Sequence, residues 1–180
     1  MKNTFGLIDG LLEKHKHIEQ TTALIQQTLN DMVGEETIET KEQFVPRHYL
    51  KQLKMLNTAE QTVAELDNVL TKHFKREEKA LVQIFSQFNS EVAEGIKHIF
   101  QEHRIIKARL IDMQKMLGEL IIGKLSQAKW RSQAWDLKAC TAKTVQFLKD
   151  HIDKENSLYQ RARQDLVKSM EAASNPEAPR

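Results

Sequence analysis

The stretch His73-Phe74-Lys75-Arg76-Glu77-Glu78 lies inside a long amphipathic segment, residues 50–94, that contains no glycine or proline. Apolar residues recur in this segment with a period near 3.6 residues, which predicts a helix. On a helix, His73 and Glu77 stack one turn apart on the same face. An imidazole and a carboxylate presented together are good metal ligands. The segment therefore predicts a long helix that carries part of a candidate metal site.

The same pair of residue types recurs further along the chain. His151-Ile152-Asp153-Lys154-Glu155 repeats the pattern 78 residues after His73 and Glu77, again within a helical period. His15 and His103, which are 88 residues apart, each lie in the middle of an apolar stripe of their own. The local contexts of the paired histidines are also similar. The sequence therefore predicts two copies of one helical hairpin.

The periodicity predicts four helices, each with one apolar stripe. They span about residues 4–32, residues 50 or 58 to 88, residues 90–118 with Asn89-Ser90 as the cap, and residues 132–170 with Ser132 as the cap. Representative stripe residues are Ile18 and Ile25, Leu66 and Leu70, Ile106 and Leu110, and Leu137 and Leu148. This pattern predicts an all-α, up-down-up-down four-helix bundle.

Two long connections are predicted in this bundle. Residues 35–49 join the first and second helices, and residues 120–131 join the third and fourth, after Gly118 ends the third helix. Residues 1–170 are expected to form one domain. Residues 171–180, which contain two prolines, are expected to be a disordered tail. Whether residues 35–49 cover the candidate site stays open.

Composition narrows the class of protein. The chain has 180 residues, of which 40% are apolar and only 6 are glycine and 3 proline, which favours helix. The net charge of +2 comes from mixed acidic and basic residues, which argues against nucleic-acid binding. No apolar run approaches the length of a membrane span. With a single cysteine, Cys140, and no stretch that resembles a signal peptide, a cytoplasmic location is expected.

The four stripe histidines and two glutamates form the candidate site. An up-down-up-down bundle brings one layer of each helix to a common centre, and burying six such groups there is costly unless something satisfies them. Two metal ions would do so, each with two histidines and with both glutamates bridging. These ligands suit iron, and also manganese or zinc. The predicted metal ligands are His15, His73, Glu77, His103, His151 and Glu155.

At these residues the chain resembles the hemerythrin-like family of His-His-Glu cation-binding domains, over residues 7–159. The motifs that carry the resemblance are Leu12-x-x-His15-x-x-Ile18, His73-x-x-x-Glu77-Glu78, Glu102-His103-x-x-Ile106 and His151-x-x-x-Glu155. The resemblance implies a bundle of hemerythrin type with a non-haem di-iron centre that handles oxygen, nitric oxide or iron itself. The ferritin-like pattern differs, because it uses a lone Glu on two helices where this chain has a lone His.

One departure from the family's oxygen carriers bears on function. The site of those carriers has five histidines, because a second histidine lies one turn from the ligand on the third helix. Here Ile99 and Lys107 occupy the positions one turn from His103, and His98 is rotated about 140° away. The resemblance therefore favours relatives linked to nitrosative or oxidative stress, or to iron sensing, over reversible oxygen carriage.

Three further residues are expected beside the ligands: Glu78 and Glu102 as surface or hydrogen-bonding neighbours, and Tyr159 as a donor to a bridging glutamate or to a bound oxygen species. Three functions stay open. The first is a di-iron protein that binds oxygen or nitric oxide in sensing, scavenging or stress response. The second is an enzyme that reduces a diatomic molecule or peroxide with a reductase partner, because the chain has no motif for an electron-donating cofactor. The third is an iron-dependent regulatory or storage module that a partner protein recognises.

Overall fold

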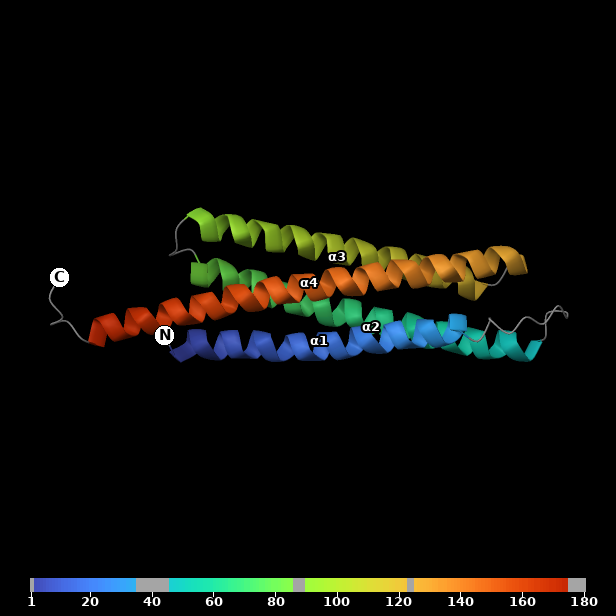
Figure 1. Ribbon diagram of the computed structural model, residues 1–180, viewed down its shortest axis with the longest axis horizontal. Coiled ribbons are helices and arrows are strands. Elements are labelled where there is room, and N and C mark those ends of the chain that lie inside the picture. Colours follow the sequence, from blue (N-terminus) through green and yellow to red (C-terminus); the bar gives the residue numbers. More distant parts are fainter. Residues whose placement is uncertain (1, 35–45, 86–89, 123–124, 175–180) are drawn as a thin grey trace.

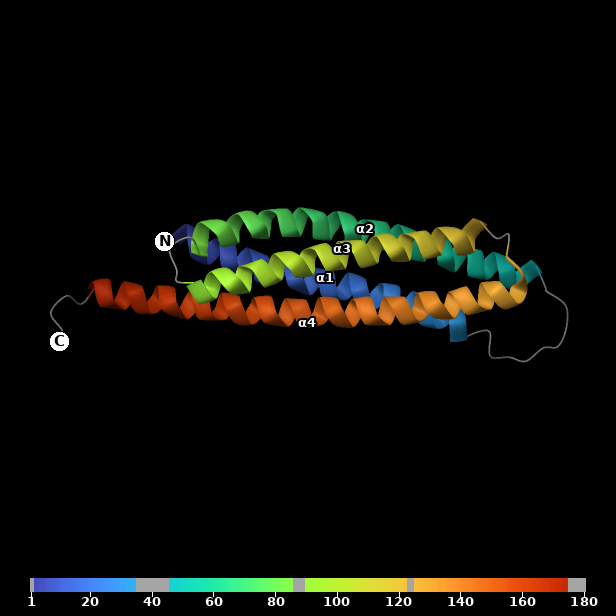
Figure 2. The same cartoon turned by 90° about the horizontal axis from the view of Figure 1, so that it is seen from above.

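A computed structural model of the chain describes residues 2–34, 46–85, 90–122 and 125–174. It contains four helices in these ranges: α1 (Lys2–Gly34), α2 (Pro46–Phe85), α3 (Ser90–Ile122) and α4 (Gln127–Ser174). Consecutive helices run in opposite directions along a shared long axis, and α4 extends past the end at which α1 begins (Figures 1 and 2). The predicted all-α, up-down-up-down four-helix bundle is confirmed.

Each helix packs against two neighbours around the axis of the bundle. Helix α1 packs against α2 and α4, and α3 packs against the same two helices, while in the described ranges the backbones of diagonally opposite helices do not come close to one another. Side chains from all four helices must therefore fill the axis. None of the four helices, over the residues described, is long and apolar enough to cross a membrane.

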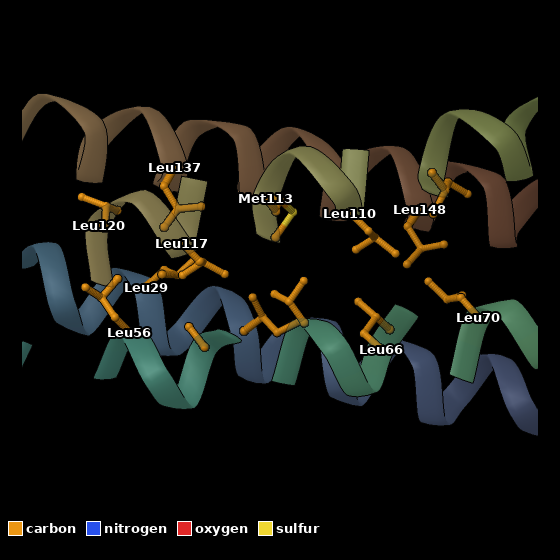
Figure 3. Packing of buried hydrophobic residues seen from close by; sticks show 14 of the residues in the cluster. Leu29, Leu56, Leu66, Leu70, Leu110, Met113, Leu117, Leu120, Leu137 and Leu148 are labelled. Atoms are coloured by element: carbon orange, nitrogen blue, oxygen red, sulfur yellow. The ribbon is translucent and has the colours of Figure 1, made fainter. Parts of the chain in front are cut away.

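The interior consists of two apolar clusters separated by a polar layer. The larger cluster includes Leu70, Leu110 and Leu137, and Figure 3 shows leucines from the facing helices meeting there. The smaller cluster contains Ile8, Leu11, Ala80, Leu81, Ile96, Ile99 and Tyr159. Fully burying one leucine contributes about 1.5–3 kcal/mol. The predicted stripes therefore hold the four helices at fixed rotations, which aim the polar layer inward.

The third helix is longer than predicted. Gly118 lies inside α3, which continues to Ile122. An interior glycine costs about 1 kcal/mol relative to alanine. Leu117 and Leu120 on either side of it are fully buried, and their burial outweighs that cost.

The fourth helix begins earlier than predicted, because Ser126 caps it instead of Ser132. The Ser126 hydroxyl accepts a hydrogen bond from the Lys129 amide, and the Ser126 carbonyl accepts one from Trp130 at 2.8 Å. Burial of Trp130 and Ala134 in the core fixes this first turn. The predicted long connection over residues 120–131 is therefore wrong, since only residues 123–126 separate α3 from α4.

The other predicted boundaries differ less. Helix α2 begins at Pro46, and proline at the first helical position is favourable because its missing N–H would have no partner there. The connection that could cover the candidate site falls mainly on residues 35–45, which lie outside the described residues. Helix α4 continues to Ser174, beyond the predicted domain end at residue 170. The rest of the predicted tail, residues 175–180, also lies outside the description.

Candidate metal centre

All six predicted ligands lie in the polar layer between the two apolar clusters. Helix α1 contributes His15, α2 contributes His73 and Glu77, α3 contributes His103, and α4 contributes His151 and Glu155. The four histidines are between 1% and 6% exposed and both glutamates are 0% exposed. Helical spacing on α2 and α4 puts each Glu one turn after its His, so both face the axis.

One group of ligand atoms gathers between α1, α2 and α4, and we call it the first position. His15 Nε2 lies 3.1 Å from His73 Nε2 and 3.2 Å from Glu155 Oε2. His73 Nε2 lies 3.4 Å from Glu77 Oε2. Ligand atoms of these four residues all fall within 4.8 Å of one another, close enough to hold one metal ion.

The other group gathers between α3 and α4, and we call it the second position. His103 Nε2 lies 3.2 Å from Glu155 Oε1, and His151 Nε2 lies 2.9 Å from the same oxygen. These three residues also offer ligand atoms within 4.8 Å of one another. Glu77 Oε2 is 3.3 Å from His103 Nε2. Glu155 therefore belongs to both groups through its two oxygens, while Glu77 belongs to the first group and approaches His103 of the second.

Hydrogen bonds on the outer side of the rings fix the orientation of three histidines. His15 Nδ1 lies 2.8 Å from Asn156 Oδ1, and His103 Nδ1 lies 3.0 Å from Glu78 Oε1. His151 Nδ1 lies 2.8 Å from Glu102 Oε2. Because these oxygens only accept, each Nδ1 donates its hydrogen. A neutral ring then carries its lone pair on Nε2, which faces the centre as a metal ligand requires.

The centre contains most of the buried polar atoms that lack a hydrogen-bond partner. Among the residues described, seven buried side-chain atoms have none, and four of them belong to predicted ligands: both Glu77 oxygens, His151 Nε2 and Glu155 Oε2. Carboxylate oxygens and imidazole lone pairs cannot satisfy one another, because both are acceptors. Cations placed between them would satisfy these atoms, so the set of donors fits a pair of metal ions.

Burial and crowding also set how these groups hold protons. Burial, together with the charge of neighbouring His15, lowers the pKa of His73 to about 4. Burial raises the pKa of Glu77 to about 7. Burial also raises the pKa of Glu155, but close contacts with His103, His15 and His151 outweigh it and hold that pKa well below its usual range. Glu155 is therefore ionised at neutral pH.

The pKa values of two histidines are raised by the two glutamates. Burial lowers the pKa of His103, but hydrogen bonds with Glu155, Glu77 and Glu78 raise it to about 9. Burial likewise lowers the pKa of His15, and Glu155 again outweighs it, so the net shift is upward. Without a metal, protons on His103 and His15 supply positive charge between the imidazoles and the carboxylates.

Sequence reasoning missed two residues that shape the centre. Phe74 stacks on His103, with ring centroids 3.8 Å apart and planes 12° apart. Asn156 holds His15, and the repeat could have revealed it, because Asn156 stands 78 residues after Glu78. The contact of Asn156 with His15 is equivalent, in the repeat, to the contact of Glu78 with His103. One histidine therefore faces an amide and the other a carboxylate.

The three expected neighbours lie beside predicted ligands, but the Tyr159 hydroxyl donates to neither glutamate. Glu78 and Glu102 both contact ligand histidines, and the Glu78 side chain remains 43% exposed. The Tyr159 ring stacks beside His15, with centroids 6.2 Å and planes 26° apart. Its hydroxyl is another buried atom without a hydrogen-bond partner. Tyr159 therefore lies close to the first position.

A groove of about 560 Å³ runs along the outside of the centre between α3 and α4. Glu102 and Lys154 line it, and their side chains form an ion pair. His98 also lines the groove and is exposed, so it does not join the four inward-facing histidines, as predicted. Glu102 is partly exposed in this groove, whereas the six predicted ligands are buried.

Comparison with known proteins gives one match. The family model for the hemerythrin HHE cation-binding domain matches residues 6–162, a range that contains all six predicted ligands. No curated protein and no solved structure matches the chain significantly.

Proposed function

Because the chain belongs to the hemerythrin HHE cation-binding domain family, we propose that it holds two iron ions in the buried centre and binds oxygen or nitric oxide there. The observation that carries the proposal is the convergence of four Nε2 atoms on two shared carboxylates, with three of the rings fixed by outward hydrogen bonds at Nδ1. Such preorganisation is what a dinuclear site requires.

In this proposal each residue has a defined task. His15 and His73 hold the ion at the first position, and His103 and His151 hold the ion at the second. Glu77 and Glu155 are shared between the ions and neutralise their charge. Iron would supply exchangeable ligand sites and a reversible change of oxidation state, and the same ligands would also accept manganese or zinc.

The surroundings of the centre favour a small ligand. An apolar cluster lies on each side of the polar layer, and the ligands themselves are nearly solvent-free. A diatomic molecule of low polarity enters such an interior at little cost, whereas a large or strongly hydrated substrate does not. Sensing or scavenging of oxygen or nitric oxide fits this geometry.

A second function is favoured by the buried polar layer itself. The unpartnered atoms of Glu77, His151 and Glu155 belong to a layer to which all four helices contribute predicted ligands. Metal occupancy would therefore stabilise the whole fold, and a partner protein could recognise that difference. This is the iron-dependent regulatory module.

Metal content and an absorption spectrum test the proposal. We expect two irons per chain, and oxo-bridged near-ultraviolet bands in air that bleach on anaerobic reduction and respond to oxygen or nitric oxide. His73→Ala and Glu155→Ala should lose iron, whereas His98→Ala, on the exposed groove, should keep both ions. Full iron content in the first two variants would contradict the ligand assignment.

A further inference from the structure

The two halves of the centre are equivalent in ligands but not in their neighbours. The 78-residue repeat that relates α2 to α4 pairs Leu81 with Tyr159. Both side chains are 0% exposed and both belong to the smaller apolar cluster. A leucine therefore fits this place in one half, and the other half carries a phenol in its place.

The hydroxyl of Tyr159 has no structural use that the fold reveals. It is buried and has no hydrogen-bond partner. Leaving a buried hydroxyl unpaired costs about 1–3 kcal/mol. The apolar body of the residue would serve equally well as phenylalanine in this cluster. A partner that arrives with a bound ligand would give the hydroxyl a function.

The location of Tyr159 assigns it to the first position. It follows Glu155 by one helical turn, and side chains on a helix lean back over the preceding turn. Its ring stacks beside His15, whose Nε2 contacts Glu155 Oε2 at 3.2 Å. Among the described residues, none of the ring contacts of Tyr159 involves His103 or His151.

The neighbours of the second position are less suited to a negatively charged ligand. Phe74 covers one face of His103. The outer partners there are two carboxylates, Glu78 and Glu102, whereas His15 faces the neutral Asn156. Anionic outer partners make the imidazoles stronger electron donors to their ion and weaken its attraction for an added anion. The first position is therefore the better place for an added anion.

Resting on the proposed di-iron function, we propose that Tyr159 donates a hydrogen bond to a small anion, or to a diatomic ligand that gains negative charge on binding, at the first position. A neutral phenol can donate to such a group, and hydrogen bonds to charged acceptors are the stronger kind. Tyr159 is a specificity-determining residue in this proposal. It selects the first position over the second for the external ligand.

Azide is a suitable probe, because it is a small anion whose binding to ferric iron gives a charge-transfer band. The oxidised, iron-loaded protein is titrated with azide as the unmodified chain, as Tyr159→Phe and as Tyr49→Phe. Tyr49 makes a matched control, because it lies on the same helix as His73 but about 36 Å away along the axis, at about 1.5 Å per residue. We expect azide to bind Tyr159→Phe about tenfold more weakly or worse. Tyr49→Phe should match the unmodified chain.

The vibration of the bound azide gives a second readout on the unmodified protein. Its antisymmetric stretch should shift in D2O, because the donor proton exchanges, and the shift should vanish in Tyr159→Phe. The metal-free variant should melt at the same temperature as the unmodified chain or higher, since an unpaired hydroxyl is removed. A lower melting temperature would assign the hydroxyl a structural role and contradict the proposal.

Other outcomes separate this inference from the function on which it rests. If Tyr159→Phe holds two irons and binds azide with unchanged affinity, the inference alone is overturned. If the azide-free ferric protein shows a phenolate charge-transfer band that Tyr159→Phe lacks, Tyr159 is a metal ligand, and the donor role is again overturned. An unmodified chain that binds no iron pair would overturn the proposed function, and this inference with it.

Discussion

Glu102 Oε2 and His151 Nδ1 lie 2.8 Å apart, while the other oxygen of Glu102 is paired with Lys154. Burial raises the pKa of Glu102, but the hydrogen bonds from Lys154 and His151 outweigh it and lower that pKa. The carboxylate therefore stays ionised at neutral pH and holds the proton of His151 on Nδ1. His151 Nε2 is left free for the interior.

This pair gives a first prediction, for Glu102→Gln. The amide removes the charge and can present its NH2 group to His151, so the ring is no longer held in one tautomer. Losing such an outer partner typically weakens metal binding by about 10–100-fold. Competition with a chelator of known affinity measures the change, and Glu65→Gln, at an exposed position on α2, is the control. Equal affinity of the two variants would contradict the role given to Glu102.

A second prediction concerns pH. The pKa of His103 is raised to about 9 because, although burial lowers it, its hydrogen bonds with the three glutamates outweigh that effect. At pH 7 the metal-free protein therefore carries a proton on His103 that a metal must displace. The apparent affinity for the metal should increase as the pH rises from 6 to 8, by up to about tenfold per pH unit for each proton released. Glu77, with a pKa raised to about 7, adds to the effect at the acidic end.

Titration calorimetry in two buffers of different ionisation enthalpy measures this proton release directly. The observed heat should differ between the buffers at pH 7, because the buffer takes up the displaced protons. An affinity that does not change with pH, together with identical heats in the two buffers, would show that the centre carries no displaceable proton.

A third prediction concerns removal of the metal. A ligand present at about 1,000 times its dissociation constant stabilises a fold by about 4 kcal/mol. For a domain of this size each kcal/mol shifts the melting temperature by about 2–4 °C, so a chelator should lower it by about 8–16 °C. Circular dichroism at a helical wavelength follows the transition. A melting temperature indifferent to chelator would count against both the di-iron site and the regulatory module.

A fourth prediction separates the fold from the site. Leu110 is 1% exposed in the larger cluster, and Leu110→Ala should lower the free energy of unfolding by about 2–5 kcal/mol. Its neighbour Ile111 is 61% exposed, and Ile111→Ala should change it by less than about 0.5 kcal/mol. Denaturant unfolding of the metal-free proteins compares the two. Both variants should still bind two metal ions, because neither residue lies in the polar layer.

The sequence anticipated the parts of the protein that depend on local periodicity. The 3.6-residue period gave the four helices, and it placed Leu70, Leu110 and Leu148 on buried faces. The same period put His73 with Glu77, and His151 with Glu155, on those faces. The repeat indicated that all six candidate ligands share one layer. Their role as metal ligands stays a prediction that the variants above will test.

Helix ends were less predictable, because they depend on competition between local signals and packing. Gly118 is a good stop signal by itself, yet the burial of Leu117 and Leu120 carries α3 past it. Ser126 and Ser132 are equally good caps in sequence. The burial of Trp130 in the core decides that the helix begins at the earlier serine.

By itself the sequence determined which residues face the interior, since that depends only on their spacing along one helix. Which groups come into contact across helices depends on the fold as a whole. Asn156 holds His15, Phe74 covers His103, and Tyr159 lies beside the first position without a hydrogen-bond partner. These contacts depend on how far each helix is rotated about its own axis and shifted along the axis of the bundle. Rotation and shift are set by the summed packing of both apolar clusters, and no single stretch of sequence contains that sum.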